Sequence, residues 1–189
     1  ATKDTVIPTV AITAPVAITS ANQAAYSVSG TCSENTRTVT VSIGGIAATP
    51  TCTALAWNTG AVNVTALSQG SVAITASHTD AVLNSASAST TTTKDSVGPT
   101  LTIGTLSAIS NGNVATYSFT GTCETLGSTV SFSLISGATV SGSASCTAGA
   151  YTAAPGTLAG LTDGSVSVSV TQADALGNSA TTPGTTTKD

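Results

Sequence analysis

Charged and aromatic residues are scarce in this sequence, at 6% and 3% of its 189 positions. Only four residues are Lys or Arg, and they are not clustered, so the basic surface that nucleic-acid binding requires is missing. No apolar run approaches the roughly 18 residues of a membrane-spanning helix, so we expect no membrane insertion. There is no methionine and no cationic segment before an apolar stretch, so we expect any signal peptide to be removed or to lie outside this sequence.

Most of the remaining positions hold Thr, Ser, Ala, Val or Gly, small or β-branched residues of which several suit pleated sheets. Apolar and polar residues alternate at period two, and no segment has a helical period. In the first half this alternation predicts strands at 10–12, 26–32, 39–43, around Cys52, and at 57–64, 72–76 and 86–92. In the second half it predicts strands containing 101–103, 117–119, 132–134 and 166–170. Such a series of short strands and turns is typical of an all-β, immunoglobulin-like β-sandwich.

A Lys-Asp signature occurs near the start, the middle and the end of the sequence, at 3–4, 94–95 and 188–189. The two halves align with an offset of 91 residues up to the first cysteine of each half, and of 94 residues from the second cysteine onward. We therefore predict two tandem immunoglobulin-like domains, at 1–94 and 95–189. The second domain has three extra residues between its cysteines, which we expect to lie in a loop.

Each predicted domain contains two cysteines, Cys32 and Cys52 in the first and Cys123 and Cys146 in the second. One pair per repeat predicts one intradomain disulfide in each domain and an oxidising compartment. Closing a loop of about twenty residues stabilises a domain by roughly 3 kcal/mol. Free buried thiols are the alternative. A zinc site is disfavoured because two cysteines without histidine partners cannot complete a tetrahedral set.

Several short motifs follow the same order along both halves, some with single-residue departures, such as Asp-Ser for Asp-Thr at 95–96. These are Asp-Thr-x-x-Pro at entry, Tyr-x-x-x-Gly-Thr-Cys, a later Cys followed by an aromatic residue, Leu-x-Asp-Gly, and Asp-Ala-x-Gly-Asn before the last strand. With them the chain resembles, over both domains, the tandem bacterial Ig-like repeats of large secreted surface adhesins. The last motif is complete at 174–178, whereas 80–84 lacks the glycine and Gln69 replaces the aspartate of the Asp-Gly turn. The resemblance implies an extracellular location on a bacterial cell surface.

Seven of the eight acidic residues fall at the predicted junctions between domains. In an Ig-like sandwich, two loops lie at the end where the first strand begins, so their polar side chains are expected to meet there. The expected sets are Asp4, Glu34, Asp80 and Asn84 in the first domain, and Asp95, Glu124, Asp174 and Asn178 in the second. Such oxygen ligands suit Ca²⁺, and the resemblance implies calcium that stiffens the junctions. The alternative is ordinary turn residues neutralised by a linker lysine such as Lys94. No other cofactor is expected.

His78 lies two residues from Asp80 in a serine-rich chain, which raises the hypothesis of a hydrolase triad. Its aligned residue in the second domain is Gln172, and no Gly-x-Ser-x-Gly elbow stands between a strand and a helix. We therefore expect no enzymatic activity, and we expect His78 to face solvent from its strand.

Two positions are aromatic in both domains: Trp57 aligns with Tyr151, and Tyr26 aligns with Tyr117. Paired aromatic residues in a chain so poor in them favour a core position, where they fill space that small residues cannot. An exposed platform for glycans is the alternative.

These observations predict a spacer or shaft segment of a bacterial surface adhesin or fibre, whose partners are neighbouring repeats of the same chain. One alternative is a module that binds a glycan or protein on a host or prey surface. Another is a subunit of a self-assembling filament, in which sandwich edges pair between chains and the Thr-rich last strand serves as an edge.

Overall fold

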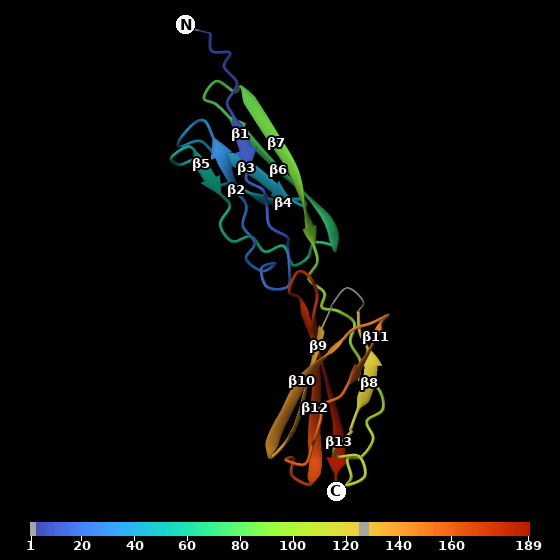
Figure 1. Ribbon diagram of the computed structural model, residues 1–189. Coiled ribbons are helices and arrows are strands. Elements are labelled where there is room, and N and C mark those ends of the chain that lie inside the picture. Colours follow the sequence, from blue (N-terminus) through green and yellow to red (C-terminus); the bar gives the residue numbers. More distant parts are fainter. Residues whose placement is uncertain (1–2, 125–128) are drawn as a thin grey trace. The chain divides into compact units, whose positions relative to one another are not determined.

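The computed structural model describes residues 3–124 and 129–189 (Figure 1). The chain divides into two compact units, Ala1–Ser96 and Val97–Asp189, called unit 1 and unit 2 below. Each unit is built from antiparallel strands in two layers, so the predicted all-β, immunoglobulin-like fold is confirmed. Nowhere in the described residues is there a helix long and apolar enough to cross a membrane.

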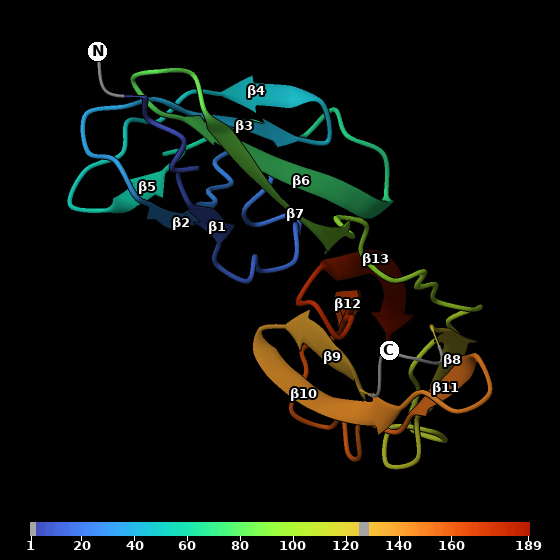
Figure 2. The same ribbon diagram turned by 90° about the horizontal axis from the view of Figure 1, so that it is seen from above.

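Unit 1 contains the strands β1 (Val10–Ile12), β2 (Ser29–Cys32), β3 (Val39–Ile43), β4 (Ile46–Ala48), β5 (Ala56–Asn58), β6 (Gly70–Thr79) and β7 (Ser85–Lys94). One sheet has the order β1-β2-β5 and the other the order β4-β3-β6-β7. Seen from above, the two sheets lie over one another as the layers of a sandwich (Figure 2). The ten-residue pairing of β6 with β7 is the longest register in this unit.

Unit 2 contains the strands β8 (Phe119–Thr122), β9 (Thr129–Ser136), β10 (Ala138–Ser145), β11 (Ala150–Ala153), β12 (Gly164–Ala173) and β13 (Ser179–Lys188). Its larger sheet has the order β10-β9-β12-β13, and β11 pairs with β8 in the smaller one. The predicted strand at 101–103 is not a regular strand, but Thr102 N–H and Gly104 N–H still donate to Thr122 and Thr120 carbonyls of β8.

Alternation along the strands sorts side chains between core and solvent. In β6 every second residue from Val72 to His78 is buried, while the residues between them are exposed. The aligned aromatic residues are in the core as predicted, with Trp57 and Tyr151 at 3% and 2% exposure. The Trp57 ring lies across Gly30 of β2, where a Cβ atom would be 2.6 Å from ring carbon Cζ2. Gly30 is therefore required for the ring to fit.

Both predicted disulfides are present, Cys32–Cys52 in unit 1 and Cys123–Cys146 in unit 2. Their Cα–Cα separations are 6.0 and 5.9 Å, within the range normal for disulfides. In unit 1 the disulfide joins Cys32, the last residue of β2, to Cys52, which lies between β4 and β5 where the chain crosses to the other sheet. In unit 2 it joins Cys123, the residue just after β8, to Cys146, which lies between β10 and β11. None of the cysteines is free.

The three extra residues of unit 2 do not form the expected loop. They lengthen the hairpin of β9 and β10, in which all eight residues of β10 pair with β9. In unit 1 the corresponding strand β4 has three residues, and Pro50 follows it closely. The prediction was wrong because the segment 138–145 has little apolar alternation, so its sequence does not look like a strand.

Candidate functional site

The loop between β6 and β7 is closed by Asp80 and Asn84. The Asp80 carboxylate accepts hydrogen bonds from Val82 N–H (2.9 Å), Asn84 N–H (2.8 Å) and the Asn84 side-chain amide (2.7 Å). Asp80 is 3% exposed. Burial opposes its ionisation, but the hydrogen bonds from Asn84 and Val82 outweigh burial, with Arg37 adding a smaller effect, so the pKa of Asp80 lies below its usual value.

Unit 2 repeats this arrangement with Asp174 and Asn178. The Asp174 carboxylate accepts hydrogen bonds from Leu176 N–H (2.8 Å), Asn178 N–H (2.9 Å) and the Asn178 side-chain amide (2.8 Å). The Asn178 side chain is the main cause of the lowered pKa of Asp174, and burial opposes it. The aspartate and asparagine of this motif therefore close the loop in both units.

The glycine position of this motif shows how the two loops differ. Gly177 has a φ of 83°, in the left-handed region that glycine adopts without cost. Leu83 occupies the same place in unit 1 with a φ of 73°, and its side chain is 82% exposed. Unit 1 keeps the same loop geometry with a residue that is strained in it.

The other predicted ligands gather only in part. The Asn84 side-chain amide lies 3.5 Å from the Asp4 carbonyl oxygen, which places Asp4 at the same end of unit 1 as Asp80. Glu34 lies between β2 and β3 and is half-buried. In unit 2, one Glu124 carboxylate oxygen lies 3.3 Å from Thr100 N–H. Asp95 belongs to the opposite end of unit 1, where its N–H donates to the Ile18 carbonyl.

Among the residues described, no three His, Cys, Asp or Glu side chains converge on one cation position. Within each unit, the loop aspartates Asp80 and Asp174 already accept three hydrogen bonds each, so they have little capacity left for a metal. Calcium at these residues stays a prediction.

His78 does not face solvent, contrary to the expectation. It is fully buried, with Nδ1 3.3 Å from the Thr38 carbonyl oxygen, and Nε2 has no hydrogen-bond partner among the described residues. The aligned Gln172 is 1% exposed, and its side chain bonds to both Glu124 N–H and the Glu124 carbonyl at 3.2 Å. Alternation at period two places His78 on the inward face of β6 and Gln172 on the inward face of β12. The alternation of apolar residues along β6 in the sequence could have predicted the burial of His78.

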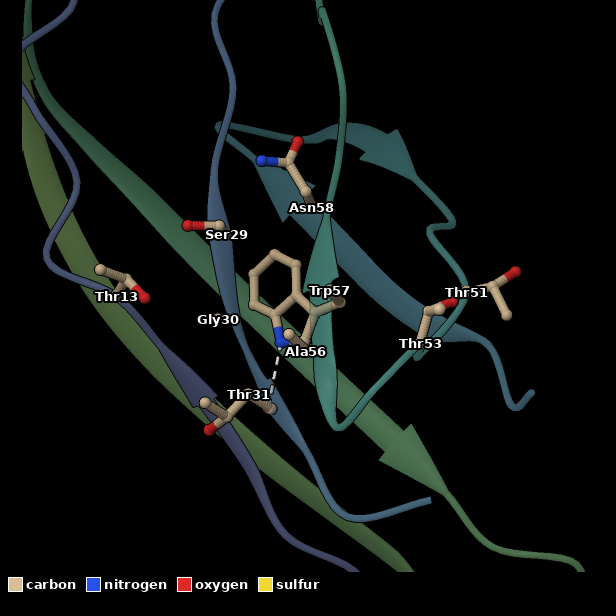
Figure 3. Close-up of a pocket in the computed structure, with 9 residues that line it drawn as sticks. All are labelled: Thr13, Ser29, Gly30, Thr31, Thr51, Thr53, Ala56, Trp57 and Asn58. Carbon is tan, nitrogen blue, oxygen red and sulfur yellow. Dashed lines mark hydrogen bonds between the residues drawn. The ribbon is translucent and has the colours of Figure 1, made fainter. Parts of the chain in front are cut away.

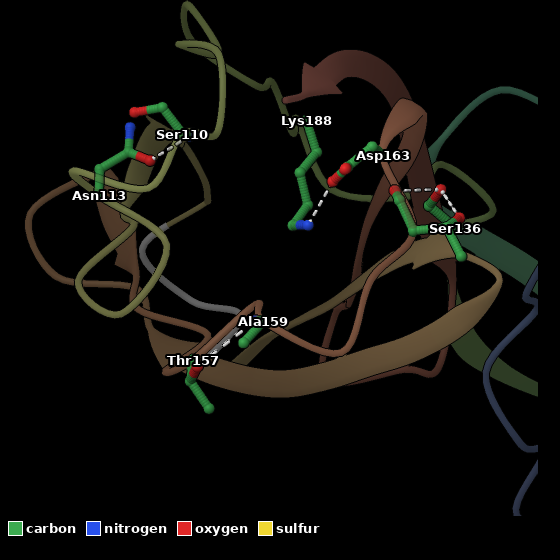
Figure 4. Close-up of polar contacts among 8 residues, drawn as sticks. Ser110, Asn113, Ser136, Thr157, Ala159, Asp163 and Lys188 are labelled. Atoms are coloured by element: carbon green, nitrogen blue, oxygen red, sulfur yellow. Dashed lines mark hydrogen bonds and ion pairs between the residues drawn. The ribbon is translucent and has the colours of Figure 1, made fainter.

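Lys94 is not the linker cation that the sequence suggested. It is 1% exposed, and Nζ donates to the carbonyls of Val64 (3.2 Å), Thr65 (2.7 Å) and Leu67 (2.6 Å). Lys188 of unit 2 instead forms an ion pair of 2.6 Å with Asp163, whose side chain is 69% exposed (Figure 4). Gln69 replaces this aspartate in unit 1. Its side-chain Nε2–H donates to the Ser96 hydroxyl, and its Oε1 accepts from Ser96 N–H.

A groove of about 660 Å³ borders β1, β2 and β5 in unit 1 (Figure 3). Its lining residues are Thr13, Ser29, Gly30, Thr31, Thr51, Thr53, Ala56, Trp57 and Asn58. A groove of about 350 Å³ occupies the corresponding place in unit 2, beside Tyr151. The ring of Trp57 is buried and its Nε1–H donates to the Thr31 carbonyl, so no exposed aromatic face is available for stacking on a sugar.

The solved structures with a similar fold include two of bacterial adhesins. The first is that of a Ca²⁺-stabilized adhesin that helps an Antarctic bacterium reach out and bind ice; it has 24% identity, a TM-score of 0.64, and covers 98% of this chain and 50% of that chain. The second concerns host cell surface retention of a 1.5-MDa bacterial ice-binding adhesin, with 21% identity, a TM-score of 0.63, and coverage of 99% and 66%. The chain thus spans half to about two thirds of their lengths.

At these identities the similarity establishes the fold, and it confirms at that level the resemblance to Ig-like repeats of bacterial surface adhesins. No protein-family model and no curated protein sequence matches the chain.

Proposed function

We propose that this chain is a spacer segment of a bacterial cell-surface adhesin, in which each unit contributes length and stiffness. The observation that carries the proposal is the position of chain entry and exit in each unit. In unit 1 the chain enters beside Asn84, which contacts Asp4, and leaves after Lys94 at the far end of β7. Ten residues of extended strand separate these ends, roughly 30 Å.

Unit 2 has the same arrangement. A Cβ atom at Gly98 would lie 2.6 Å from the Ser179 carbonyl oxygen, so the chain enters beside the first residue of β13. It leaves after Lys188, at the other end of that ten-residue strand. Because the chain enters and leaves each unit at opposite ends, each further copy adds the full length of one unit. A spacer requires this property.

The terminal segments of each unit are paired so that tension along the chain loads them in shear. Ile18 N–H donates to the Thr93 carbonyl and Asp95 N–H donates to the Ile18 carbonyl, a parallel pairing at the exit of unit 1. Ile109 makes the same two bonds with Thr187 and Asp189 in unit 2. Shear loads several hydrogen bonds together, and the disulfide prevents full extension of each unit.

The role we propose is structural and needs no catalytic residue. Its partners are neighbouring repeats of the same chain, and its location is outside the bacterial cell. The similar adhesin that is Ca²⁺-stabilized supports calcium as a further stiffening factor at the ends of units. That contribution comes in addition to the disulfides and the loop-closing aspartates. Asp80 and Asp174 would take part only by giving up hydrogen bonds that close their loops.

Small-angle X-ray scattering of the disulfide-bonded chain in dilute solution tests the proposal. We expect an elongated particle whose maximum dimension exceeds that of one unit by at least roughly 30 Å. Parallel measurements in EDTA and in millimolar calcium, with melting temperatures, test the metal. A compact, side-by-side particle in both conditions contradicts the spacer role, and identical profiles and melting temperatures contradict only the role of calcium.

A further inference from the structure

The strand β10 forms one margin of the larger sheet of unit 2. All eight residues from Ala138 to Ser145 pair with β9 on one side. In the described part of the chain no strand pairs with the other side, and both views show β10 along the rim of its unit (Figures 1 and 2). An edge strand of this length presents backbone N–H and C=O groups to any extended chain that comes beside it.

This edge lacks the features by which proteins usually protect such strands. Its side chains are Ala, Thr, Val, Ser and Gly, with no charge and no proline. The opposite edge of the same sheet, β13, contains Pro183 in its middle. Proline has no N–H to donate and interrupts pairing with another strand.

The corresponding edges of unit 1 are shorter or are covered at one end. β4 has only three residues, and Pro50 stands two residues after its end. The end of β7 is covered by the segment around Ile18, which bonds with Thr93 and Asp95. By contrast, all eight residues of β10, in the hairpin that contains the extra residues of unit 2, lie on an edge without charge or proline.

Gly142, in the middle of β10, gives its side-chain space to an aromatic ring of the neighbouring strand. It is exposed and pairs with Phe132 of β9, whose ring occupies the space of the missing side chain. A Cβ atom at Gly142 would lie 2.6 Å from the Phe132 ring carbon Cζ. The Phe132 ring therefore accounts for this glycine, and the small residue leaves no bulky side chain in the middle of the edge strand.

We propose that β10 is a self-association edge, which pairs antiparallel with β10 of a second copy of the chain. Pairing centred on Ser141 sets Ser141 against its own copy, Thr139 against Ser143, and Val140 against Gly142. Each pair shares one face of the sheet, because Thr139, Ser141 and Ser143 alternate with the other two residues. No charges face each other, and the larger Val140 meets the smallest residue.

The chemistry of the edge selects a second copy over a foreign peptide. Recognition of a foreign strand takes its specificity from pockets for alternate side chains, and β10 offers only small uncharged groups. A strand of the same composition meets no steric or electrostatic penalty there. The resulting two-fold dimer would join the larger sheets of two chains that run in opposite directions.

Sedimentation equilibrium of the intact disulfide-bonded chain, up to about 1 mM, tests the proposal. A single strand pair is a small interface, so we expect a dimer with Kd on the order of 10⁻⁴ M. Ser141→Lys places two lysines opposite each other and should raise Kd at least tenfold. Ala47→Lys, on the exposed edge strand β4 of unit 1, is the matched control and should leave Kd unchanged.

Amide hydrogen exchange provides the local readout, and melting temperatures establish that both variants are folded. Exchange within β10 should slow as the protein concentration rises, while exchange in β4 stays constant. A chain that remains monomeric at about 1 mM overturns the proposal. So does a dimer that Ser141→Lys does not weaken, or one in which the exchange of β10 is independent of concentration.

Discussion

Asp80 and Asn84 are joined by three hydrogen bonds across a five-residue loop. Asp80 N–H donates to the Asn84 carbonyl at 2.9 Å, and the Asn84 N–H and side-chain amide donate to the two oxygens of the Asp80 carboxylate at 2.8 and 2.7 Å. Asp174 and Asn178 make the same three bonds in unit 2, at 2.9, 2.9 and 2.8 Å. The pair fixes the β6–β7 and β12–β13 connections at the end where each unit begins.

The first prediction concerns acid stability. The pKa values of Asp80 and Asp174 are lowered in the folded chain, so their contribution to stability is fully present above the unfolded pKa of about 3.9. That contribution is lost as the pH falls through the folded pKa. The double variant Asp80→Ala, Asp174→Ala should therefore show a lower melting temperature near neutral pH and a weaker loss on acidification than the unmodified chain.

Thermal unfolding followed by circular dichroism as a function of pH measures this difference. Glu34→Gln is the matched control, since it removes a carboxylate from the same end of unit 1 without breaking the loop. If the melting temperature of the double variant falls on acidification as steeply as that of the unmodified chain, other carboxylates control the acid transition.

The second prediction uses the difference between Leu83 and Gly177. Leu83→Gly should stabilise unit 1 by roughly 1 kcal/mol, because glycine relieves the left-handed backbone conformation at a side chain that is 82% exposed. Gly177→Leu should destabilise unit 2 by a similar amount. Chemical denaturation measures both, and Val82→Gly is the control that should not stabilise, because Val82 does not have a positive φ.

The third prediction concerns the buried lysine. Lys94→Met leaves the carbonyls of Val64, Thr65 and Leu67 without their donor and should destabilise unit 1 by about 3 kcal/mol. Lys188→Met removes a single ion pair to an exposed carboxylate and should cost less than about 1 kcal/mol. Urea denaturation measures the stability of both variants. Equal losses of stability would contradict the importance of the three hydrogen bonds that Lys94 donates to carbonyl oxygens.

The fourth prediction compares the residues at the aligned positions 78 and 172. Gln172→Leu leaves both backbone groups of Glu124 without their side-chain partner and should destabilise unit 2 by about 2 kcal/mol. His78→Leu removes a buried Nε2 that has no partner among the described residues and one long contact, of 3.3 Å, between Nδ1 and the Thr38 carbonyl. Its cost in unit 1 should therefore be under about 1 kcal/mol. Hydrogen exchange of the two units, measured separately by mass spectrometry, distinguishes the two effects.

Several features could be predicted from residue pattern because they depend on local or pairwise regularities. The alternation of Val39, Val41 and Ile43 sets the buried face of β3, and the structure has the strand at the same bounds. The repeat of one cysteine pair per half was enough to assign both disulfides. The core position of Trp57 and Tyr151 followed from their recurrence in a chain that has few aromatic residues.

The candidate calcium ligands were placed by topology alone, and here the sequence was less informative. It located Asp80 and Asn84 together with Asp4, but not the fact that their polar atoms bond to each other. A loop that is closed by carboxylate and amide side chains and a loop that binds a metal through them can have the same residue types at similar spacing. Only the direction in which each side chain points distinguishes these two uses.

By itself, the sequence determined the two tandem repeats, the sandwich fold and the cysteine pairs. Period-two alternation and recurring motifs can be recognised from residues that are close together along the chain. Tertiary structure alone decided that Lys94 and His78 are buried and that β10 is an edge strand. Burial of a charge depends on carbonyls supplied by a distant segment, here Val64 to Leu67. Edge position depends on which strand lies on the other side, and no residue of β10 encodes that absence locally.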